Sequence, residues 1–365
     1  TPLPKEQSIL FTYLPTKVDP FEFPFLINAD FLTTASREDI HYKNNWNIFL
    51  FSNIGKKIVE WAILMADKTD GYLNLLPTKE LVADEQESKY QLVCAFNSAY
   101  KDALESEAFI KDSDGKMRKQ EEVIVDKSGL SSIVGHTTFC SLISTAKTLP
   151  NASLDIQVLS KKVFSKIDRI DVDTVVEGIK KHTSVLASWM KSASAESLSS
   201  LYSWLLNNKD ISRPFINELP IFSFGSDLYS FSEVKQKEGY LILNTKLAPV
   251  KGILTRLGFI CSETIVDTHP LAGLVAQQSE KDIFSSISKK DFSVLSFDER
   301  RKLFTTLKEL DGIGPESLKS LSIFKNAKGI LVPLGTMTAY DNGHPDWLTP
   351  YMVSEDESCD ESKEL

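Results

Sequence analysis

Several kinds of sequence feature are scarce or missing in this 365-residue chain, and each absence narrows the class of protein. The four cysteines, Cys94, Cys140, Cys261 and Cys359, lie far apart without a C-x-x-C pair. This spacing predicts neither a disulfide framework nor a zinc site, and it indicates thiols in a reducing compartment. The longest apolar runs are much shorter than the roughly 20 residues of a membrane-spanning helix. We therefore expect a cytoplasmic protein that does not cross a membrane.

Motifs of catalysis and of nucleotide binding are missing as well. No G-x-S-x-G, H-E-x-x-H, G-x-x-x-x-G-K-[ST] or G-x-G-x-x-G pattern occurs, and the five histidines are scattered. We therefore expect no metal and no cofactor in this chain, and no complete active site. The net charge of −9 argues against nucleic acid as a partner, because binding to phosphates requires clustered Lys and Arg.

What the sequence does contain indicates an α+β protein. Two short, aromatic-rich segments, residues 9–14 and 23–27, are separated by prolines and predict two strands of one sheet. From Trp46 to Met65 the apolar residues recur at helical spacing, which predicts a long helix packed on that sheet.

Further along the chain, three patterns predict helices. Thr174 to Glu177 and Ser296 to Glu299 match the capping box that begins a helix. Residues 197–206 carry leucines and a tyrosine on one helical face. The acidic residues 354–365 predict a disordered tail.

An internal similarity suggests a repeated module. Residues 219–231 and 321–334 both read L-x-I-F, a polar turn with glycine and an apolar run, and residues 108–117 are a weaker third copy. This pattern predicts three β-hairpins, with Phe109, Phe222 and Phe324 as equivalent residues. We expect a module of about a hundred residues that ends in a hairpin.

These patterns predict two or three modules with helices packed on small mixed sheets. We expect a first α/β module over residues 1–105, a helical module ending in a hairpin over 106–235, a second α/β module over 236–350 and a tail over 351–365. The chain opens Thr-Pro-Leu-Pro, with neither an initiator methionine nor a signal pattern, so we expect a fragment of a longer polypeptide.

Residues 307–321 offer one alternative function. Their G-I-G turn between two helical segments is similar to a helix-hairpin-helix, in which backbone N–H groups bind a DNA phosphate. Glu309, Asp311 and Glu316 would repel that phosphate, so the competing interpretation is a helix C-cap at Gly312 or Gly314.

The first fifty residues resemble a known family. Leu14-Pro15, residues 23–31, the triplet Ser36-Arg37-Glu38 and Trp46-Asn47 follow one another as the corresponding motifs do in the repeats of sacsin. The triplet is also similar to the S-R-E of the middle domain in the ninety-kilodalton heat-shock chaperone.

The resemblance implies a fold like that chaperone's middle domain and a role beside a GHKL-type ATPase domain. In that role Arg37 is the one catalytic residue, reaching the γ-phosphate of ATP, while Asn28, Trp46 and Asn47 are fold determinants. ATP and magnesium would belong to an upstream domain of the same polypeptide, and client proteins would be the other partners. The alternative is an interaction scaffold in which Arg37 holds a structural ion pair. A second copy of the chain, in a homo-oligomer, is a further candidate partner.

Overall fold

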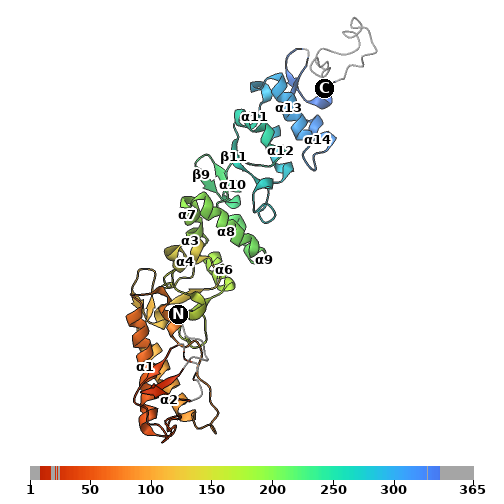
Figure 1. Cartoon of the computed structure of the whole chain (residues 1–365). Coiled ribbons are helices and arrows are strands. Elements are labelled where there is room, and N and C mark those ends of the chain that lie inside the picture. The colour runs from red at the N-terminus through yellow and green to blue at the C-terminus, as the bar shows by residue number, and fades with distance from the viewer. Residues whose placement is uncertain (1–8, 18–20, 22, 24, 327, 338–365) are drawn as a thin grey trace. The chain divides into compact units, whose positions relative to one another are not determined.

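The computed structural model describes residues 9–17, 21, 23, 25–326 and 328–337, and it is an α+β protein (Figure 1). The chain divides into two compact units, Thr1–Gly178 and Ile179–Leu365. The predicted boundaries at 105/106 and 235/236 each fall within the last turn of a helix, and the division into three modules stays a prediction. The expected tail over 351–365 lies outside the described residues.

The described residues of the first unit form helices and three small sheets. Its helices are α1 (Asn45–Met65), η2 (Asp70–Leu75), α2 (Tyr90–Ser106), η3 (Gln120–Glu122), α3 (Ser131–Val134), α4 (His136–Leu142), α5 (Ile156–Leu159) and α6 (Val172–Lys181), which runs into the second unit. Its strands are β1 (Leu10–Thr12), β2 (Leu14–Pro15), β3 (Ile27–Asn28), β4 (Ile110–Lys111), β5 (Met117–Arg118), β6 (Ile124–Asp126) and β7 (Asp168–Ile170). β1 lies between antiparallel β2 and parallel β3, and β6 pairs in parallel with β7.

The second unit begins with helices and continues with small sheets. Its helices are α7 (Thr183–Ser192), α8 (Ala195–Asn207), α9 (Lys209–Ser212), η4 (Ile216–Glu218), α10 (Phe231–Gln236), η5 (Ala248–Val250), α11 (Lys251–Arg256), η6 (Val266–Thr268), α12 (Glu280–Ser288), η7 (Phe292–Val294), α13 (Phe297–Lys308), α14 (Pro315–Lys319) and η8 (Leu334–Thr336). Its strands are β8 (Phe222–Phe224), β9 (Asp227–Tyr229), β10 (Tyr240–Leu243), β11 (Ile260–Ile265), β12 (Phe324–Lys325) and β13 (Leu331–Val332). β10 and β11 pair in parallel.

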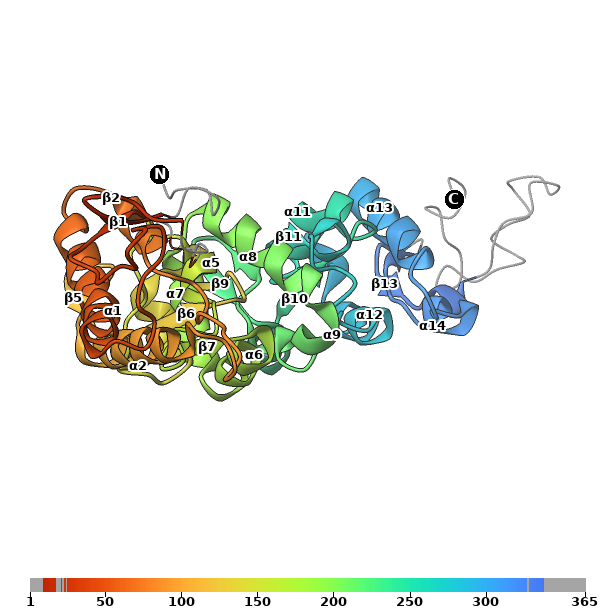
Figure 2. The same cartoon turned by 60° about the horizontal axis from the view of Figure 1, so that its bottom comes forward.

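The long helix is confirmed, and it packs closely on α2. Figures 1 and 2 show the two helices side by side in the first unit. A Cβ atom added at Gly55 would lie 2.7 Å from the carbonyl oxygen of Phe96 and 2.9 Å from the backbone nitrogen of Tyr100. Because real Cβ atoms do not approach so closely, glycine is what allows the two backbones to meet there.

The predicted N-terminal strands need correction. The segment 9–14 is broken at Tyr13, whose φ is +63°, so it forms a hairpin of β1 and β2 instead of one strand. Among the described residues of the segment 23–27, Ile27 alone belongs to a strand, β3, while Phe23 is 1% exposed and packs against Phe25 and Phe96. Aromatic burial, not strand pairing, therefore explains the apolar composition at Phe23.

Of the predicted helix starts, one is confirmed and one is wrong. Ser296 and Glu299 form a true capping box at the start of α13. Thr174 lies inside α6, and its backbone N–H donates to the Asp171 carboxylate at 2.9 Å. Asp171 therefore caps α6, three residues before the predicted cap. The helix predicted over 197–206 is confirmed as α8.

The three predicted hairpins are confirmed: β4 pairs with β5, β8 with β9 and β12 with β13, all antiparallel. The first paired residues are Ile110, Phe222 and Phe324. The equivalent of Phe222 in the first hairpin is therefore Ile110 and not Phe109, which precedes the strand. All four side chains are fully buried.

The first and third hairpins share their turn geometry. The Oδ1 atoms of Asp112 and Asn326 each accept hydrogen bonds from the backbone N–H groups two and four residues later, at 2.9–3.1 Å. A glycine follows three residues after each, Gly115 and Gly329, with φ of +80° and +78°. A 3₁₀ turn also starts eight residues after Asp112, at η3, and eight residues after Asn326, at η8.

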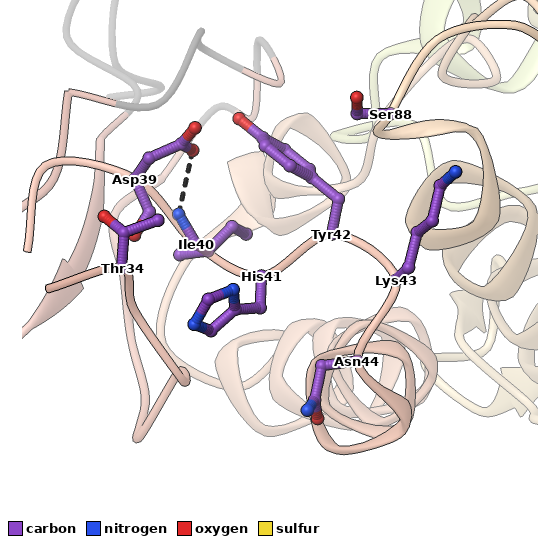
Figure 3. A pocket seen from close by; sticks show the side chains of 8 residues that line it. All are labelled: Thr34, Asp39, Ile40, His41, Tyr42, Lys43, Asn44 and Ser88. Carbon is purple, nitrogen blue, oxygen red and sulfur yellow. Dashed lines mark hydrogen bonds between the residues drawn. The ribbon is translucent and has the colours of Figure 1, made fainter.

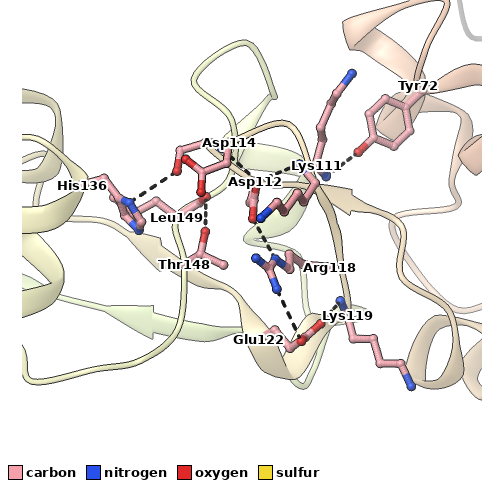
Figure 4. Close-up of polar contacts among 12 residues, drawn as sticks. Tyr72, Lys111, Asp112, Asp114, Arg118, Lys119, Glu122, His136, Thr148 and Leu149 are labelled. Atoms are coloured by element: carbon pink, nitrogen blue, oxygen red, sulfur yellow. Dashed lines mark hydrogen bonds and ion pairs between the residues drawn. The ribbon is translucent and has the colours of Figure 1, made fainter.

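Asp112 also forms an ion pair, whereas the corresponding residue of the third hairpin, Asn326, carries no charge. Its carboxylate is 1% exposed and accepts a hydrogen bond of 2.7 Å from Nε of Arg118, as Figure 4 shows. Burial opposes ionisation of Asp112, but the hydrogen bonds from Arg118 and from the turn outweigh it, so the pKa of Asp112 is lowered from its ordinary value of 3.8.

Replacing Asp112 by Asn keeps an acceptor for the turn, as Asn326 shows, but removes the ion pair. We expect Asp112→Asn to lower the free energy of unfolding by about 1–3 kcal/mol near neutral pH. Because the pKa is lowered in the folded state, the carboxylate stabilises the protein fully above pH 3.8 and loses this effect as the pH falls through the folded-state pKa. Urea denaturation of both proteins over a pH series measures the difference. A difference that stays constant below pH 3.8 would contradict this assignment.

Candidate functional site

Arg37 lies at the tip of a closed loop in the first unit. An antiparallel bridge between Thr33 and Ile40 closes the loop, and the N–H of Arg37 donates to the carbonyl of Thr34 at 2.9 Å. The loop does not lead directly into a helix, because α1 starts only at Asn45. Before α1, the segment after Arg37 runs antiparallel to the segment before it, so that Ile40 lies opposite Thr33.

The backbone of Arg37 is strained. Its φ is +61°, in the left-handed region that glycine adopts without penalty after a β-turn. For a residue with a Cβ atom this conformation costs about 1–2 kcal/mol. Tertiary contacts around the loop must therefore hold Arg37 there.

The main contact is the side chain of Asn47, which is fully buried in α1. Its Oδ1 accepts a hydrogen bond of 2.9 Å from the N–H of Leu32, and its Nδ2 donates to the carbonyls of Leu32 and His41 at 2.9 and 3.0 Å. These two residues flank the bridge that closes the loop. One amide thus fastens both ends of the Arg37 loop to α1. The Nε1 of Trp46 adds a bond of 2.8 Å to the carbonyl of Asp30.

The two charges in the triplet have different environments. Glu38 forms an ion pair of 2.5 Å with Lys17, and its carbonyl accepts a hydrogen bond from the N–H of Lys17. The Arg37 side chain is exposed, and among the described residues its guanidinium has no hydrogen-bond or ion-pair partner. The acidic neighbour is therefore neutralised by Lys17, while the guanidinium faces solvent.

An open depression of about 650 Å³ adjoins the loop. Figure 3 shows that its side chains come from the loop, from the segment that leads into α1 and, opposite them, from Ser88. His41, Tyr42 and Lys43 line it together with Asp39, whose carboxylate accepts a hydrogen bond from the N–H of Ile40. Arg37 does not line this depression, so the two features are neighbours and not one site.

The other residue types considered for chemistry are not gathered into a site. In the part of the chain that the structure describes, no group of three or more His, Cys, Asp or Glu side chains could hold a metal ion. Cys94, Cys140 and Cys261 are free thiols, and Cys359 lies outside the described residues. None of the helices in the described ranges is long and apolar enough to cross a membrane.

In the helix-hairpin-helix-like segment, Gly314 is the N-cap of α14, so it is not a helix C-cap. Gly312 has a φ of +75° in the loop after α13. Asp311 in this turn pairs with Lys246 at 2.9 Å, and Glu316 pairs with Lys319 at 2.7 Å. Carboxylates thus lie where a DNA phosphate would approach.

The fold and the Arg37 loop together describe an α+β protein with an exposed arginine on a fixed loop. A scan of the chain against models of protein families finds no match. Searches of curated proteins and of solved structures also find none.

Asn47 provides a direct test of how the loop is held. Asn47→Ala would leave the N–H of Leu32 without its acceptor, while the carbonyls of Leu32 and His41 would keep the bonds they accept from the N–H groups of His41 and Asn44. We expect the substitution to lower the free energy of unfolding by about 1–3 kcal/mol. Amide hydrogen exchange at Leu32 and His41 should accelerate beyond what this global loss explains.

Asn53→Ala is the matched control in the same helix. Within the part of the chain that the structure describes, the side chain of Asn53 donates to the carbonyl of Phe49, one turn earlier in α1, and to no other group. Its removal should change stability by less than about 0.5 kcal/mol. Equal effects of the two substitutions would contradict the role assigned to Asn47.

Proposed function

We propose that this chain couples an ATPase domain of the GHKL type to protein clients, and that Arg37 is the coupling residue. In this proposal Arg37 reaches the γ-phosphate of ATP bound by that domain, which also supplies the magnesium ion. The chain itself holds no nucleotide. The proposal places the protein in the cytoplasm.

The observation that carries the proposal is that the Arg37 guanidinium is exposed on a backbone with a positive φ. An exposed guanidinium without a partner among the described residues is available to an external anion. A guanidinium is planar, always charged and suited to phosphate oxygens, and it stabilises charge on a transferred phosphoryl group. Strain of the kind found at Arg37 is concentrated at functional sites in proteins. A merely solvent-exposed charge would not need a left-handed backbone.

The fixed loop supports the proposal further. Catalytic positioning requires that a side chain projects from a rigid base, because small displacements reduce the rate strongly. The hydrogen bonds of Asn47 to Leu32 and His41 supply such a base. The ion pair with Lys17 neutralises the Glu38 carboxylate, which would otherwise compete for Arg37. The interaction scaffold would instead have Arg37 in a structural ion pair. DNA binding has the least support, given the carboxylates near Gly312.

Substitution of Arg37 tests the proposal in the natural polypeptide that carries this sequence. We expect Arg37→Ala to lower the steady-state rate of ATP hydrolysis about 10³-fold at saturating ATP, because a transition-state arginine is lost. ATP binding, measured separately, should be unchanged. Arg37→Lys should not restore the rate, since an ammonium cannot form two parallel bonds to phosphate.

Two controls separate chemistry from folding. Arg37→Gly removes the guanidinium and also relieves the backbone strain, so its rate should be as low as that of Arg37→Ala in a protein at least as stable. Lys56→Ala removes one exposed positive charge from α1 and should keep the wild-type rate. Unchanged turnover in Arg37→Gly, or a polypeptide without ATPase activity, would reject the proposal in favour of the scaffold.

A further inference from the structure

Three aromatic rings of the second unit form a cluster at the second hairpin. Phe224 and Tyr229 lie on β8 and β9, and Tyr240 begins β10. The ring centroids are 5.7 Å apart for Phe224 and Tyr229, 5.1 Å for Phe224 and Tyr240, and 5.8 Å for the two tyrosines. The interplanar angles are 76°, 53° and 73°, so the rings pack against one another in edge or tilted contacts and do not stack flat.

A positive charge of the chain itself occupies this cluster. The Nζ of Lys237 lies 4.9 Å from the ring centroid of Tyr229 and 5.2 Å from that of Tyr240. Both distances are within the roughly 6 Å at which an ammonium is attracted by the negative face of a ring. Lys237 itself is exposed, in the segment between α10 and β10. The two tyrosine rings, packed against the buried Phe224, thus already hold an alkylammonium group, on a side chain that can leave without unfolding a helix.

Nearby carboxylates add to the attraction. Burial raises the pKa of the Tyr229 hydroxyl, and Tyr240, Asp227 on β9 and Glu233 in the first turn of α10 add to this effect. Asp227 and Glu233 thus supply negative charge beside the Tyr229 ring. Lys235 is the opposing charge, because it lines the neighbouring pocket with Lys237.

The same backbone positions carry no such cluster in the other hairpins. By strand pairing, Phe224 and Tyr229 correspond to Asp112 and Arg118 in the first hairpin, which form an ion pair. In the third hairpin the corresponding residues are Asn326 and Val332. The hairpin fold therefore does not require aromatic side chains at these positions.

A pocket of about 430 Å³ continues from the cluster, and Tyr240 and Lys237 line it. Its walls combine apolar side chains, including Phe259 and Ile283, with polar ones, including Gln277 and Asp282. A chain attached to an ammonium in the cluster therefore has room beside it.

We propose that Phe224, Tyr229 and Tyr240 form a binding site for an alkylammonium group, with Lys237 as its internal occupant. The ligand is a lysine or methylated lysine of a polypeptide, or a small quaternary ammonium compound, and it displaces the Lys237 side chain when it binds. This site stands apart from the proposed role of Arg37, since no residue is shared.

The first experiment titrates the full chain with tetramethylammonium chloride, with sodium chloride as the ionic-strength control, and follows the ring signals of the tyrosines by NMR. Lys237→Ala removes the internal competitor, so it should bind the probe about tenfold more tightly than the wild type. Tyr229→Leu, in the Lys237→Ala background, keeps the apolar volume and should abolish binding, while Tyr229→Phe should retain it.

A second titration distinguishes the sources of the ammonium. It uses a glycine-flanked peptide with a trimethylated lysine and the same peptide with norleucine. Tighter binding of the trimethyllysine peptide than of tetramethylammonium identifies a polypeptide ligand, and equal binding identifies a small ammonium compound. Absence of binding to folded Lys237→Ala protein, or binding that survives Tyr229→Leu, overturns the proposal and leaves Lys237 with a structural role.

Discussion

The hydrogen bonds of Asn47 are the constraint on which the candidate site depends. A carboxamide offers an acceptor and two donors in one plane, and here it bonds to Leu32 on one side of the loop and to His41 on the other. Because the Asn47 side chain is fully buried, its amide bonds to the loop instead of to water. The rigidity of the helix is thereby transmitted to the loop, and the left-handed conformation of Arg37 persists without glycine.

Those parts of the fold that rest on local signals could be predicted from the sequence. The helical spacing of apolar residues from Trp46 to Met65 gave α1 within one residue, and Ser296 with Glu299 gave the start of α13. The hairpins were predictable because a turn with glycine between two short apolar runs is a signal contained in about a dozen residues. Even there, the alignment placed Phe109 one residue away from its structural counterpart, since both Phe109 and Ile110 are apolar and buried.

The rest depends on contacts between residues that are distant in sequence. Nothing near Phe23 distinguishes a strand from an irregular segment whose ring packs on Phe96, more than seventy residues later. The resemblance marked Asn47 as a fold determinant, but its partners appear only when Leu32 and His41 are brought to α1. The start of α6 was predicted at the wrong residue for a similar reason. Asp and Thr both serve as helix caps, so the sequence does not decide between Asp171 and Thr174, and the structure shows that Asp171 is the cap.

The three hairpins separate what the fold needs from what a site needs. Each buries two adjacent apolar side chains, and the first and third stabilise their turns with a buried Asp or Asn. The positions of Phe224 and Tyr229 in the second hairpin hold an aromatic pair. The corresponding positions hold an ion pair in the first hairpin and a polar and an aliphatic residue in the third, although the strand pairing is the same. Since the backbone tolerates all three, the side chains there are free to differ in chemistry, and the second hairpin presents aromatic faces to a cation. Sequence similarity among the hairpins therefore carries information about the fold, whereas the differences among them carry information about binding.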